Sequence, residues 1–397
     1  MLKGKTIILG VTGSIAAYKI ANLASSLVKL HANVHVIMTK NACNFINPIT
    51  FETLTGNKCI TDTFDRNFEF NVEHVSLAKS ADLFLVAPAS ANIIGKIASG
   101  ICDDMLTTTL FAFNRGHKLI APAMNTNMYL NPILQDNIEK LKKYGYIFIE
   151  PNSGHLACGD QGVGKMEEPE KLLEYIINYS LKSEEFKNKK ILVSAGRTEE
   201  AIDPVRYISN HSTGKMGYAI AKWAHLMGAS VTLVSGPSSL TPFMGINVIN
   251  VKSADDMFNI IKDIYKDFDY IIMTAAVADY TVLEYENNKI KKNDNNLNIE
   301  LRRTNDILKY LGENKVGNQK IIGFSMETEN LIENSKNKLL KKNADMICAN
   351  SINNKNTGFG YDTNLVTLVT KDDCIELPFG TKEEIAIEIL KYIKDMK

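Results

Sequence analysis

The chain has 397 residues, enough for two or three domains that each bury a core of their own. Lys+Arg and Asp+Glu both number 45, so the formal net charge is zero, which argues against a general affinity for nucleic acid or an anionic membrane. No apolar run reaches the roughly 18 residues of a membrane span. The N-terminus lacks a signal peptide's apolar core, and the six scattered cysteines form no C-x-x-C pair. We therefore expect a cytoplasmic protein with reduced thiols.

Two halves of the chain begin alike. Residues 3–13 (KGKTIILGVTG) and 187–196 (KNKKILVSAG) each join a basic lead, an apolar strand and a Gly-containing turn. Helical patterns follow at 14–30 and 217–228. Further strands are expected at 33–39, 81–90 and 117–125 in the first half, and at 230–236, 269–279 and 319–328 in the second. Near-continuous apolar strands that alternate with helices are typical of parallel sheets covered on both faces.

The sequence therefore predicts an α/β protein with two Rossmann-like, doubly wound domains in tandem. We expect the domains at 1–182 and 187–397, joined within the polar segment 181–190 (LKSEEFKNKK). Ligands of such sheets collect at the carboxyl ends of the strands. Many of the chemically interesting residues stand at expected strand ends, among them Gly13, Thr39, Asn125, Gly196, Asp279 and Phe324.

Gly13 and Ser14 lie in the turn between the first expected strand and the following helix, where exposed amides and the helix dipole favour the binding of a phosphate. A purely structural glycine at a tight turn is the alternative. The turn lacks the third Gly of G-x-G-x-x-G, and no acidic residue follows the second strand (MTKNA). A mononucleotide is therefore favoured over a nicotinamide dinucleotide. Further on, Ser90 and Asn92 offer a hydroxyl and an amide to a phosphate or a flavin edge, unless they are only helix caps.

Residues 155–166 (HLACGDQGVGKM) nearly match the phosphate loop G-x-x-x-x-G-K-[ST]. Met166 stands where that loop needs a hydroxyl for Mg²⁺, and the segment lies far beyond the first strand–helix turn. Four glycines flank Cys158, which makes burial in a packed core unfavourable for this thiol. The segment is therefore expected to be a Gly-rich flap.

In the second half, residues 194–217 (SAGRTEEAIDPVRYISNHSTGKMG) run from a strand end through a polar loop to a helix start. Arg206, Asn210 and Lys215, with Ser212, Thr213 and Gly214, supply donors for an anion. From the residues alone this is an anion-binding loop.

Several motifs together resemble the flavin-containing cysteine decarboxylase family. They are GSIAAYK (13–19), HVSL (74–77), PASAN (88–92), PAMNTNM (122–128) and ACGDQGVGKM (157–166). The second half resembles the ligase domain that is often fused to this decarboxylase. The resemblance covers nearly all 397 residues, with the motifs in the expected order. It implies the bifunctional phosphopantothenoylcysteine decarboxylase/phosphopantothenate–cysteine ligase family of coenzyme A biosynthesis.

For the first half, the resemblance implies an FMN site and three catalytic residues. His74 would serve the oxidation step, Asn125 would bind the substrate carboxylate or orient the thiol, and Cys158 would protonate the enethiolate. Alone, a single histidine is more often structural, and Asn125 could simply end a turn. Lys165 departs from the family's usual Arg and loses its bidentate geometry. The implied FMN residues are Gly13, Ser14, Thr39, Ser90 and Asn92.

For the second half, the resemblance implies CTP as the activator and an acyl-cytidylate intermediate. Asn210 would stabilise that intermediate, and Lys289 would balance the phosphate charge. By itself, a lysine-rich loop is usually only solvated. Mg²⁺ is expected with the triphosphate, held largely by phosphate oxygens and water. The implied CTP residues are Met273, Thr274, Ala275, Asp279, Lys289, Asn305, Asp306, Ile307, Leu308, Phe324, Lys338 and Lys342, the last two at i and i+4 on one helical face.

The leading hypothesis is thus an enzyme that ligates cysteine to 4′-phosphopantothenate and then decarboxylates the product to 4′-phosphopantetheine. Its partners would be small molecules, and the family implies a homo-oligomer, a dodecamer built from trimers and dimers. Arg197 and Met326 depart from the family where a small residue or Pro is more usual, and they could alter loop packing or nucleotide affinity. A nicotinamide-dependent oxidoreductase with tandem dinucleotide folds is one alternative, and a non-catalytic binding protein is another.

Overall fold

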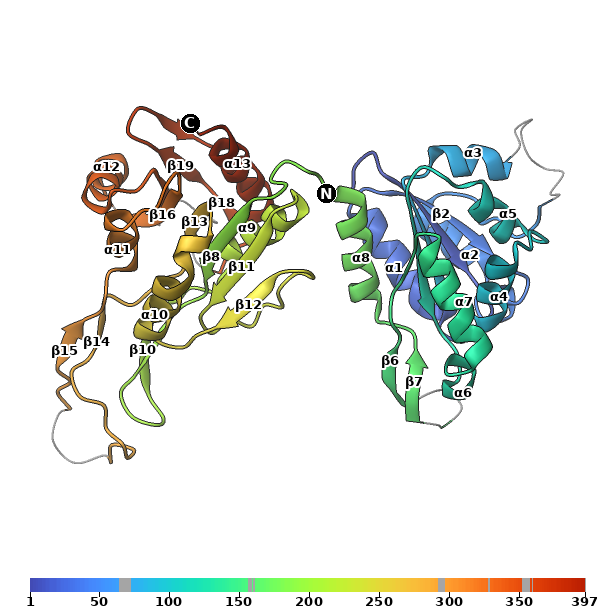
Figure 1. The fold of residues 1–397 in the computed structure, drawn as a ribbon, viewed down its shortest axis with the longest axis horizontal. Coiled ribbons are helices and arrows are strands. Elements are labelled where there is room, and N and C mark those ends of the chain that lie inside the picture. The colour runs from blue at the N-terminus through green and yellow to red at the C-terminus, as the bar shows by residue number, and fades with distance from the viewer. Residues whose placement is uncertain are drawn as a thin grey trace. The chain divides into compact units, whose positions relative to one another are not determined.

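The computed structural model describes residues 1–63, 73–155, 159, 161–291, 297–327, 329–351, 358 and 360–396. These residues form two compact units, Met1–Leu181 and Lys182–Lys397, which are described separately as the N-terminal and the C-terminal unit. Figure 1 shows a sheet between helices in each of them. In the described part of the chain, no helix combines the length and the apolar character that crossing a membrane requires.

The N-terminal unit contains a five-stranded parallel sheet in the order β2-β1-β3-β4-β5, and a separate two-stranded hairpin, β6–β7. The strands are β1 (Thr6–Val11), β2 (Asn33–Met38), β3 (Leu83–Ala89), β4 (His117–Pro122), β5 (Tyr146–Phe148), β6 (Asn152–His155) and β7 (Gln161–Lys165). The helices are α1 (Ala17–Lys29), α2 (Pro48–Thr55), α3 (Glu73–Ser80), α4 (Ala91–Ser99), α5 (Met105–Ala112), α6 (Thr126–Tyr129), α7 (Pro132–Lys143) and α8 (Pro169–Leu181).

Helices cover both faces of this sheet because its strands are apolar on both sides. All seven residues of β3 are buried, as expected for a central parallel strand. Helices α1 and α8 pack together on one face, and α4 and α7 pack together on the other (Figure 1). One core cluster joins Phe84 and Ile120 of the strands to Ile94 of α4 and Leu106 of α5.

The C-terminal unit is built on an eight-stranded sheet in the order β12-β11-β8-β13-β16-β17-β19-β20, parallel up to β17 and antiparallel at β19 and β20. The strands are β8 (Lys190–Ala195), β9 (Glu199–Ala201), β10 (Tyr207–Ser209), β11 (Ser230–Ser235), β12 (Asn247–Asn250), β13 (Tyr270–Met273), β14 (Tyr280–Val282), β15 (Leu301–Arg303), β16 (Lys320–Glu327), β17 (Met346–Ser351), β18 (Thr363–Asn364), β19 (Val366–Val369), β20 (Cys374–Glu376) and β21 (Gly380–Thr381). The helices are α9 (Lys215–Leu226), α10 (Ala254–Ile264), α11 (Ile307–Glu313), α12 (Leu331–Lys342) and α13 (Lys382–Asp395).

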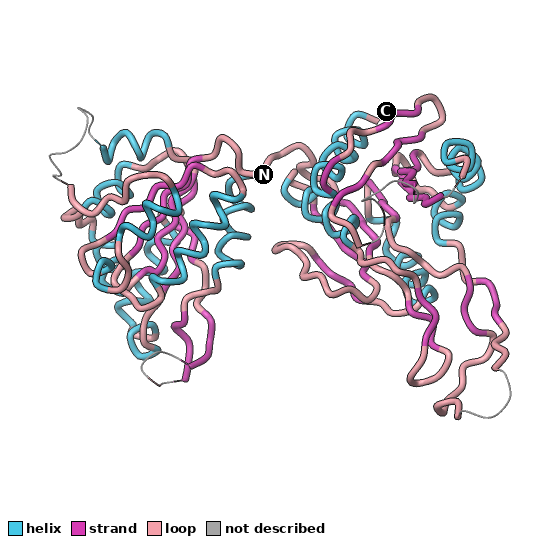
Figure 2. Tube along the Cα trace, turned by 180° about the vertical axis from the view of Figure 1, so that it is seen from behind, coloured by secondary structure: helices cyan, strands magenta, loops and turns pink. Residues whose placement is uncertain are grey.

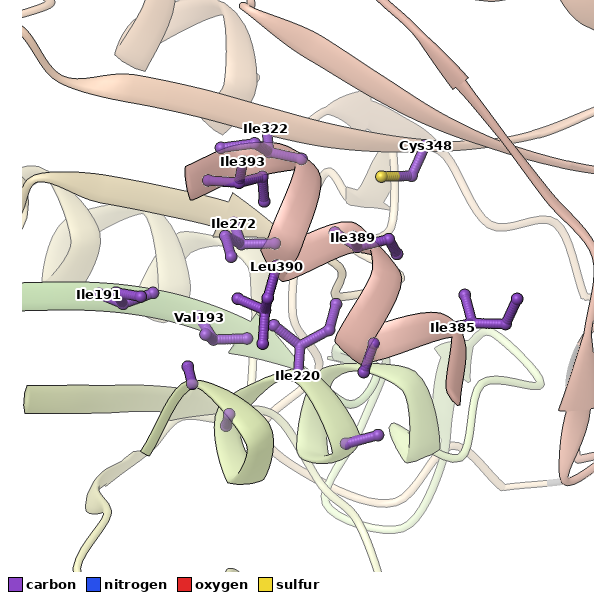
Figure 3. Close-up of a cluster of buried hydrophobic side chains, with 14 of the residues drawn as sticks. Ile191, Val193, Ile220, Ile272, Ile322, Cys348, Ile385, Ile389, Leu390 and Ile393 are labelled. Carbon is purple, nitrogen blue, oxygen red and sulfur yellow. The ribbon is translucent and has the colours of Figure 1, made fainter. Parts of the chain in front are cut away.

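The residues of the central strands alternate between the two faces of this sheet. Ile191 and Val193 of β8 face α9 and α13, as Figure 3 shows, and they share a core cluster with Ile220 and Leu390 of these helices. Leu192, between them in the chain, belongs to the opposite cluster under α10, α11 and α12. Figure 2 shows the same layering from behind.

The predicted α/β class and the two doubly wound domains are confirmed, and the predicted parallel pairing holds except at β19 and β20 of the C-terminal sheet. One predicted strand, 269–279, is wrong in length, since β13 ends at Met273. The polar side chains of the neighbouring residues explain the early end. The hydroxyl of Thr274 donates to the main-chain oxygen of Ser194, and the Ser194 hydroxyl accepts from the amide of Ala275 at 3.1 Å, so these side-chain bonds replace the sheet ladder.

Candidate active sites

The N-terminal sheet reverses its strand order between β1 and β3. In doubly wound sheets, a crevice for a ligand forms at such a switch point, outside the carboxyl ends of the strands. Gly13 and Ser14 follow β1 directly, and Ser90 and Asn92 follow β3. The structure thus brings four of the five predicted flavin residues to one switch point. Thr39 follows β2, beside β1 on the same edge.

A buried hydroxyl ties the two strand ends together at this point. Thr12 Oγ1 donates to the main-chain oxygen of Pro88 at 2.6 Å and accepts from the amide of Ser90 at 3.1 Å. Sequence reasoning missed Thr12, because its pattern only marks the end of a strand. Gly13 is required for a different reason: a Cβ there would lie 2.6 Å from the Cβ of Asn41. The turns after β1 and β2 can therefore approach closely.

Ser90 acts as the N-cap of α4. Its hydroxyl accepts from the amide of Ile93 at 3.4 Å, as the helix-cap alternative expected. The first amides of a helix have no partner within the helix, so those of Ala91 and Asn92 open the first turn of α4 beside the switch point. Thr39 Oγ1 accepts from the amide of Ala42 at 3.3 Å. The hydroxyls of Ser90 and Thr39 thus bind the backbone of their own turns, and the amides at the start of α4 can bind a ligand.

Asn125 lies after β4, on the segment that the β6–β7 hairpin covers. Its Oδ1 accepts from the amide of Asn127 at 2.8 Å, and the amide of Met124 donates to Gly164 of the hairpin at 3.0 Å. A Cβ on Gly164 would lie 2.3 Å from the Met124 oxygen, and one on Gly162 would lie 2.5 Å from the hydroxyl of Thr126. The glycines therefore let the hairpin close onto the Asn125 segment.

The flap cysteine, Cys158, lies outside the described residues, between the two strands of this hairpin. The end of the hairpin is held by charge. Lys165 pairs with Glu168 at 3.0 Å, and Lys19 of α1 pairs with the same carboxylate at 2.7 Å. The hydrogen bond from Lys19, followed by that from Lys165, lowers the pKa of Glu168. In this chain, Lys165 thus braces the flap against α1.

The structure does not bring His74 to this edge within one chain. His74 is in the first turn of α3, whose last residue lies just before β3 and therefore at the amino edge of the sheet. Figures 1 and 2 both show α3 at the end of the unit opposite the β6–β7 hairpin.

The C-terminal sheet has its own switch point, between β8 and β13. The turn after β8 is compact: a Cβ on Gly196 would lie 2.7 Å from the Gly236 oxygen, and one on Gly217 of α9 would lie 2.4 Å from the hydroxyl of Thr274. Gly214, at a φ of 84°, is the N-cap of α9. Helix α9 therefore starts directly over the switch point, next to the predicted nucleotide residues Thr274 and Ala275.

Asn210 follows the short β9–β10 hairpin and is exposed. Its Nδ2 donates to the main-chain oxygen of Ala276 at 2.9 Å, and Ala276 in turn donates to the oxygen of Gly196 at 3.0 Å. Asn210 is thereby fixed to the segment that leaves β13. The predicted residues Asn210, Thr274 and Ala275 thus lie together.

Lys289 is exposed and belongs to the segment that follows β14. This segment is bound to the loop between β9 and β10 through one buried carboxylate, Asp203, which accepts from the amide of Ile290 at 3.1 Å and from Arg206 Nη1 at 2.7 Å. Sequence reasoning missed Asp203. The dipeptide Asp-Pro at 203–204 signals a local turn, but nothing in it signals a contact with residue 290.

A second group of predicted nucleotide residues is connected by polar contacts. Lys338 Nζ of α12 donates to the oxygen of Phe324 at 2.8 Å, and Lys342 pairs with Asp306, the N-cap of α11. Burial lowers the pKa of Lys338. Phe324 lies inside β16 and not at its end, so the predicted strand-end position was wrong. The two lysines nevertheless share one face of α12, as predicted.

The remaining predicted nucleotide residues differ in exposure. Met273, Ile307 and Leu308 are buried. Asp279 and Asn305 are exposed, and Asn305 Nδ2 donates to Asp255 at 3.2 Å. Across the described ranges, no group of three His, Cys, Asp or Glu side chains could hold a metal ion. The described cysteines are all free thiols.

Comparison with known proteins decides the family. The family described as Flavoprotein matches residues 1–181, and the DNA/pantothenate metabolism flavoprotein C-terminal domain matches residues 186–396. The coenzyme A biosynthesis bifunctional protein CoaBC of Borreliella burgdorferi is 47% identical over 395 residues, covering 99% of this chain and 100% of that protein. The chain belongs to the CoaBC family.

A second CoaBC protein agrees with this assignment. That of Bacillus subtilis is 46% identical over 397 residues, covering 99% of this chain and 97% of that protein. A crystal structure of the C-terminal domain of a CoaBC protein is 46% identical and covers 53% of this chain and 97% of that domain, with a TM-score of 0.46. As a CoaBC protein, the chain is a bifunctional enzyme of coenzyme A biosynthesis with a ligase and a decarboxylase activity, and its N-terminal unit is a flavoprotein domain.

Proposed function

We propose that the C-terminal unit joins cysteine to 4′-phosphopantothenate with CTP, and that the N-terminal unit decarboxylates the product with FMN. The observation that carries this proposal is the presence of two separate switch points, β1/β3 and β8/β13, each next to some of the residues that the family resemblance implies for one activity. They are Gly13, Ser14, Ser90 and Asn92 at the first, and Asn210, Thr274 and Ala275 at the second. Two independent ligand crevices fit two reactions better than one shared site does.

FMN suits the N-terminal unit. The strand order 2-1-3-4-5 is the doubly wound order whose β1/β3 switch point holds FMN in flavodoxin-like folds. The start of α4 at Ala91 and Asn92 and the turn at Gly13 and Ser14 offer amides to the phosphate. When bound, FMN would take two electrons from the thiol-bearing carbon, so that the carboxylate can leave as carbon dioxide, and would return them to the enethiolate that remains, so that the product is a thiol.

The residues of the flap region handle the substrate. Asn125 binds the carboxylate or orients the thiol, and the glycines at 162 and 164 close the hairpin over it. The hydroxyl of Thr126 is buried and has no hydrogen-bond partner in the described part of the chain, which leaves it available to a polar group at this seam. Cys158 donates a proton to the enethiolate that remains after carbon dioxide has left.

The ligase reaction has two steps. A carboxylate oxygen of 4′-phosphopantothenate attacks the α-phosphorus of CTP, and pyrophosphate leaves; the amine of cysteine then attacks the acyl carbon, and CMP leaves. Lys289, Lys338 and Lys342 offset the charge of the triphosphate, which carries Mg²⁺ on its own oxygens. The amide of Asn210 stabilises the acyl-cytidylate and the oxyanion that develops when the amine attacks.

The position of His74 bears on assembly. Since α3 lies at the edge opposite Asn125, His74 is proposed to reach the site of a neighbouring copy, so that the decarboxylase works as an oligomer. Trimers of the N-terminal unit and dimers of the C-terminal unit would together form a dodecamer in the cytoplasm. The molar mass in solution, measured by light scattering, tests this part: a monomer would contradict it.

A visible spectrum of the purified protein tests the first activity, and mass analysis after incubation with 4′-phosphopantothenate, cysteine and CTP tests both. A flavin band together with 4′-phosphopantetheine is the expected result. A colourless protein that still forms 4′-phosphopantothenoylcysteine would refute the flavin assignment alone. The absence of any ligated product would refute the ligase assignment.

A further inference from the structure

Asp203 is a buried carboxylate within the C-terminal unit, and no step of the proposed ligase reaction uses it. It is 2% exposed and its side chain is fully covered. Burying a carboxylate costs free energy unless the group is paired and hydrogen-bonded. The hydrogen-bond donors of Asp203 therefore identify the segments that it connects. The carboxylate of Asp203 accepts four hydrogen bonds from three residues, two bonds on each oxygen.

The first oxygen makes a local turn. Oδ1 of Asp203 accepts from the amides of Val205 at 2.7 Å and Arg206 at 2.8 Å, the usual bonds of an Asp-Pro turn. This turn closes the hairpin whose second strand, β10, leads directly to Asn210.

The second oxygen makes a long-range connection. Oδ2 accepts from Arg206 Nη1 at 2.7 Å and from the amide of Ile290 at 3.1 Å, which is 87 residues away in the chain and follows Lys289. Arg206 Nη1 also donates to the main-chain oxygen of Ile290 at 3.2 Å. The backbone of Ile290 is thus held on both its polar groups by the Asp203–Arg206 pair.

Neighbouring contacts confine the same two segments. The amide of Glu286 donates to the oxygen of Ile202 at 3.1 Å, and β9 packs against β14. Figures 1 and 2 show β14 and β15 as a ribbon that extends from the sheet on the same side as the β9–β10 loop. Burial alone would raise the pKa of Asp203, but the amides of Val205, Arg206 and Ile290 and the charge of Arg206 lower it to about 2, so the carboxylate is ionised near neutral pH.

We propose that Asp203 is a positioning residue of the ligase: its Oδ2 fixes the segment of Lys289 to the hairpin that presents Asn210. The inference rests on the proposed roles of Lys289 and Asn210. The carboxylate accepts from the amide of Ile290, the residue after Lys289, and from the amide of Arg206, four residues before Asn210, so it ties the two segments together. Small displacements of such groups reduce rates strongly.

The two oxygens suggest a selective substitution in the full-length protein. In Asp203→Asn the remaining oxygen keeps the two amides of the turn, while an NH₂ group replaces Oδ2 and faces the Ile290 amide and Arg206 donor to donor. The matched control is Asp269→Asn, at the amino edge of the sheet. The carboxylate of Asp269 also binds a distant segment: Oδ2 accepts from the amide of Lys190 at 2.8 Å, and Oδ1 accepts from Lys189 Nζ at 3.2 Å.

The expected result is a loss confined to CTP-dependent activation. Pyrophosphate release from CTP and 4′-phosphopantothenate should slow in kcat by about 10- to 100-fold in Asp203→Asn and by less than about twofold in Asp269→Asn. Decarboxylation of supplied 4′-phosphopantothenoylcysteine should stay unchanged in both variants. Equal losses in the two variants would overturn the inference.

A double-variant cycle separates positioning from general destabilisation. If Asp203 acts through Lys289, adding Lys289→Gln to Asp203→Asn should slow pyrophosphate release by less than about threefold beyond the slower single variant. If the fold-losses of the two single variants multiply in the double variant, the positioning role of Asp203 is wrong, while the proposed function still stands. If Lys289→Gln and Asn210→Asp each ligate at the wild-type rate, it is the proposed function that fails.

Hydrogen exchange keeps the inference testable even where a variant does not fold. In the wild-type chain, the Ile290 amide should exchange much more slowly than an unbonded amide of the same sequence, because it is bound to a buried carboxylate. Exchange at the unbonded rate would show that the connection does not exist. In Asp203→Asn, protection should vanish at Ile290 and persist at Val205 and Arg206.

Discussion

The two units of this CoaBC protein use the same kind of sheet but support their candidate site residues differently. In the N-terminal unit, with the strand order 2-1-3-4-5, Asn125 and the predicted flavin residues follow strands of the main sheet, and Thr12 bonds the ends of β1 and β3 directly. In the C-terminal unit, Asn210 and Lys289 lie on segments outside the main sheet, and Asp203 connects them.

The difference concerns what supports each site. A turn at a sheet edge is held in place by the strands on either side. A ribbon outside the sheet is held only by its own contacts. Substitutions should therefore affect the two activities separately. The first unit relies on the hydroxyl of Thr12 between two strand ends, and the second relies on the buried carboxylate of Asp203 between two segments outside the sheet.

The largest expected effect separates the two activities completely. Cys158→Ser should lower decarboxylation by about 10²- to 10⁴-fold and leave ligation intact, because it removes the proposed proton donor. Asn210→Asp should lower amide formation by about 10²- to 10³-fold while the flavin band persists. Product masses from single-turnover reactions measure both losses. Normal 4′-phosphopantetheine yield from Cys158→Ser would contradict the flap assignment.

A smaller effect is expected where the hairpin meets the Asn125 segment. In Gly164→Ala the added methyl group would lie 2.3 Å from the oxygen of Met124, at a φ of 134° that an alanine rarely adopts. We expect a loss of about 1–3 kcal/mol in stability and about tenfold in decarboxylation, with ligation unchanged. Gly145→Ala is the control, since it has a φ of 83° with open space around it. Equal decarboxylation in both variants would refute the contact.

Thr12→Val tests the bond between β1 and β3. Valine keeps the shape of threonine and leaves the amide of Ser90 without its acceptor, which costs about 1–3 kcal/mol when buried. The melting temperature of the flavin-bound unit should fall, and FMN should dissociate more readily, as measured by released flavin fluorescence. The exposed Thr53→Val, whose hydroxyl only bonds Ile49 in its own helix, should change stability by less than about 0.5 kcal/mol.

The smallest effect is a pH dependence in the C-terminal unit. Burial lowers the pKa of Lys382, the charge of Lys215 lowers it further, and the charge of Asp362 partly offsets the two. The resulting pKa of Lys382 is about 8. Between this value and the usual lysine pKa of about 10.4, the unfolded chain binds a proton that the native chain does not, so the free energy of unfolding rises with pH.

Denaturant unfolding at pH 7.5 and at pH 9.5, compared with Lys382→Met, isolates this contribution. The wild type should gain stability relative to the variant as the pH rises. A constant difference between the two proteins would show that Lys382 keeps an ordinary pKa. The lysine also donates to the oxygens of Gly358 and Tyr361, at 3.0 and 2.6 Å, so the variant should be less stable at both pH values.

Much of the first site was readable from short motifs. Gly13, Ser90 and Asn125 follow strands that the apolar runs predict. Because the strands are parallel, their carboxyl ends lie at one edge of the sheet. The motifs could not separate His74 from that edge, because helix position depends on how α3 crosses the sheet. The length of β13 was also misjudged, since the hydroxyls of Ser194 and Thr274 end it through contacts that no periodicity encodes.

The sequence by itself determined the α/β class and the parallel part of both sheets. Apolar runs and helical periods report whether each element is buried, which is a local property. Only the tertiary structure decided the strand order within each sheet, the closure of Gly164 on Met124 and the connection from Asp203 to Ile290. These depend on which distant segments become neighbours. A pattern of burial leaves that choice open, because many arrangements bury the same residues equally well.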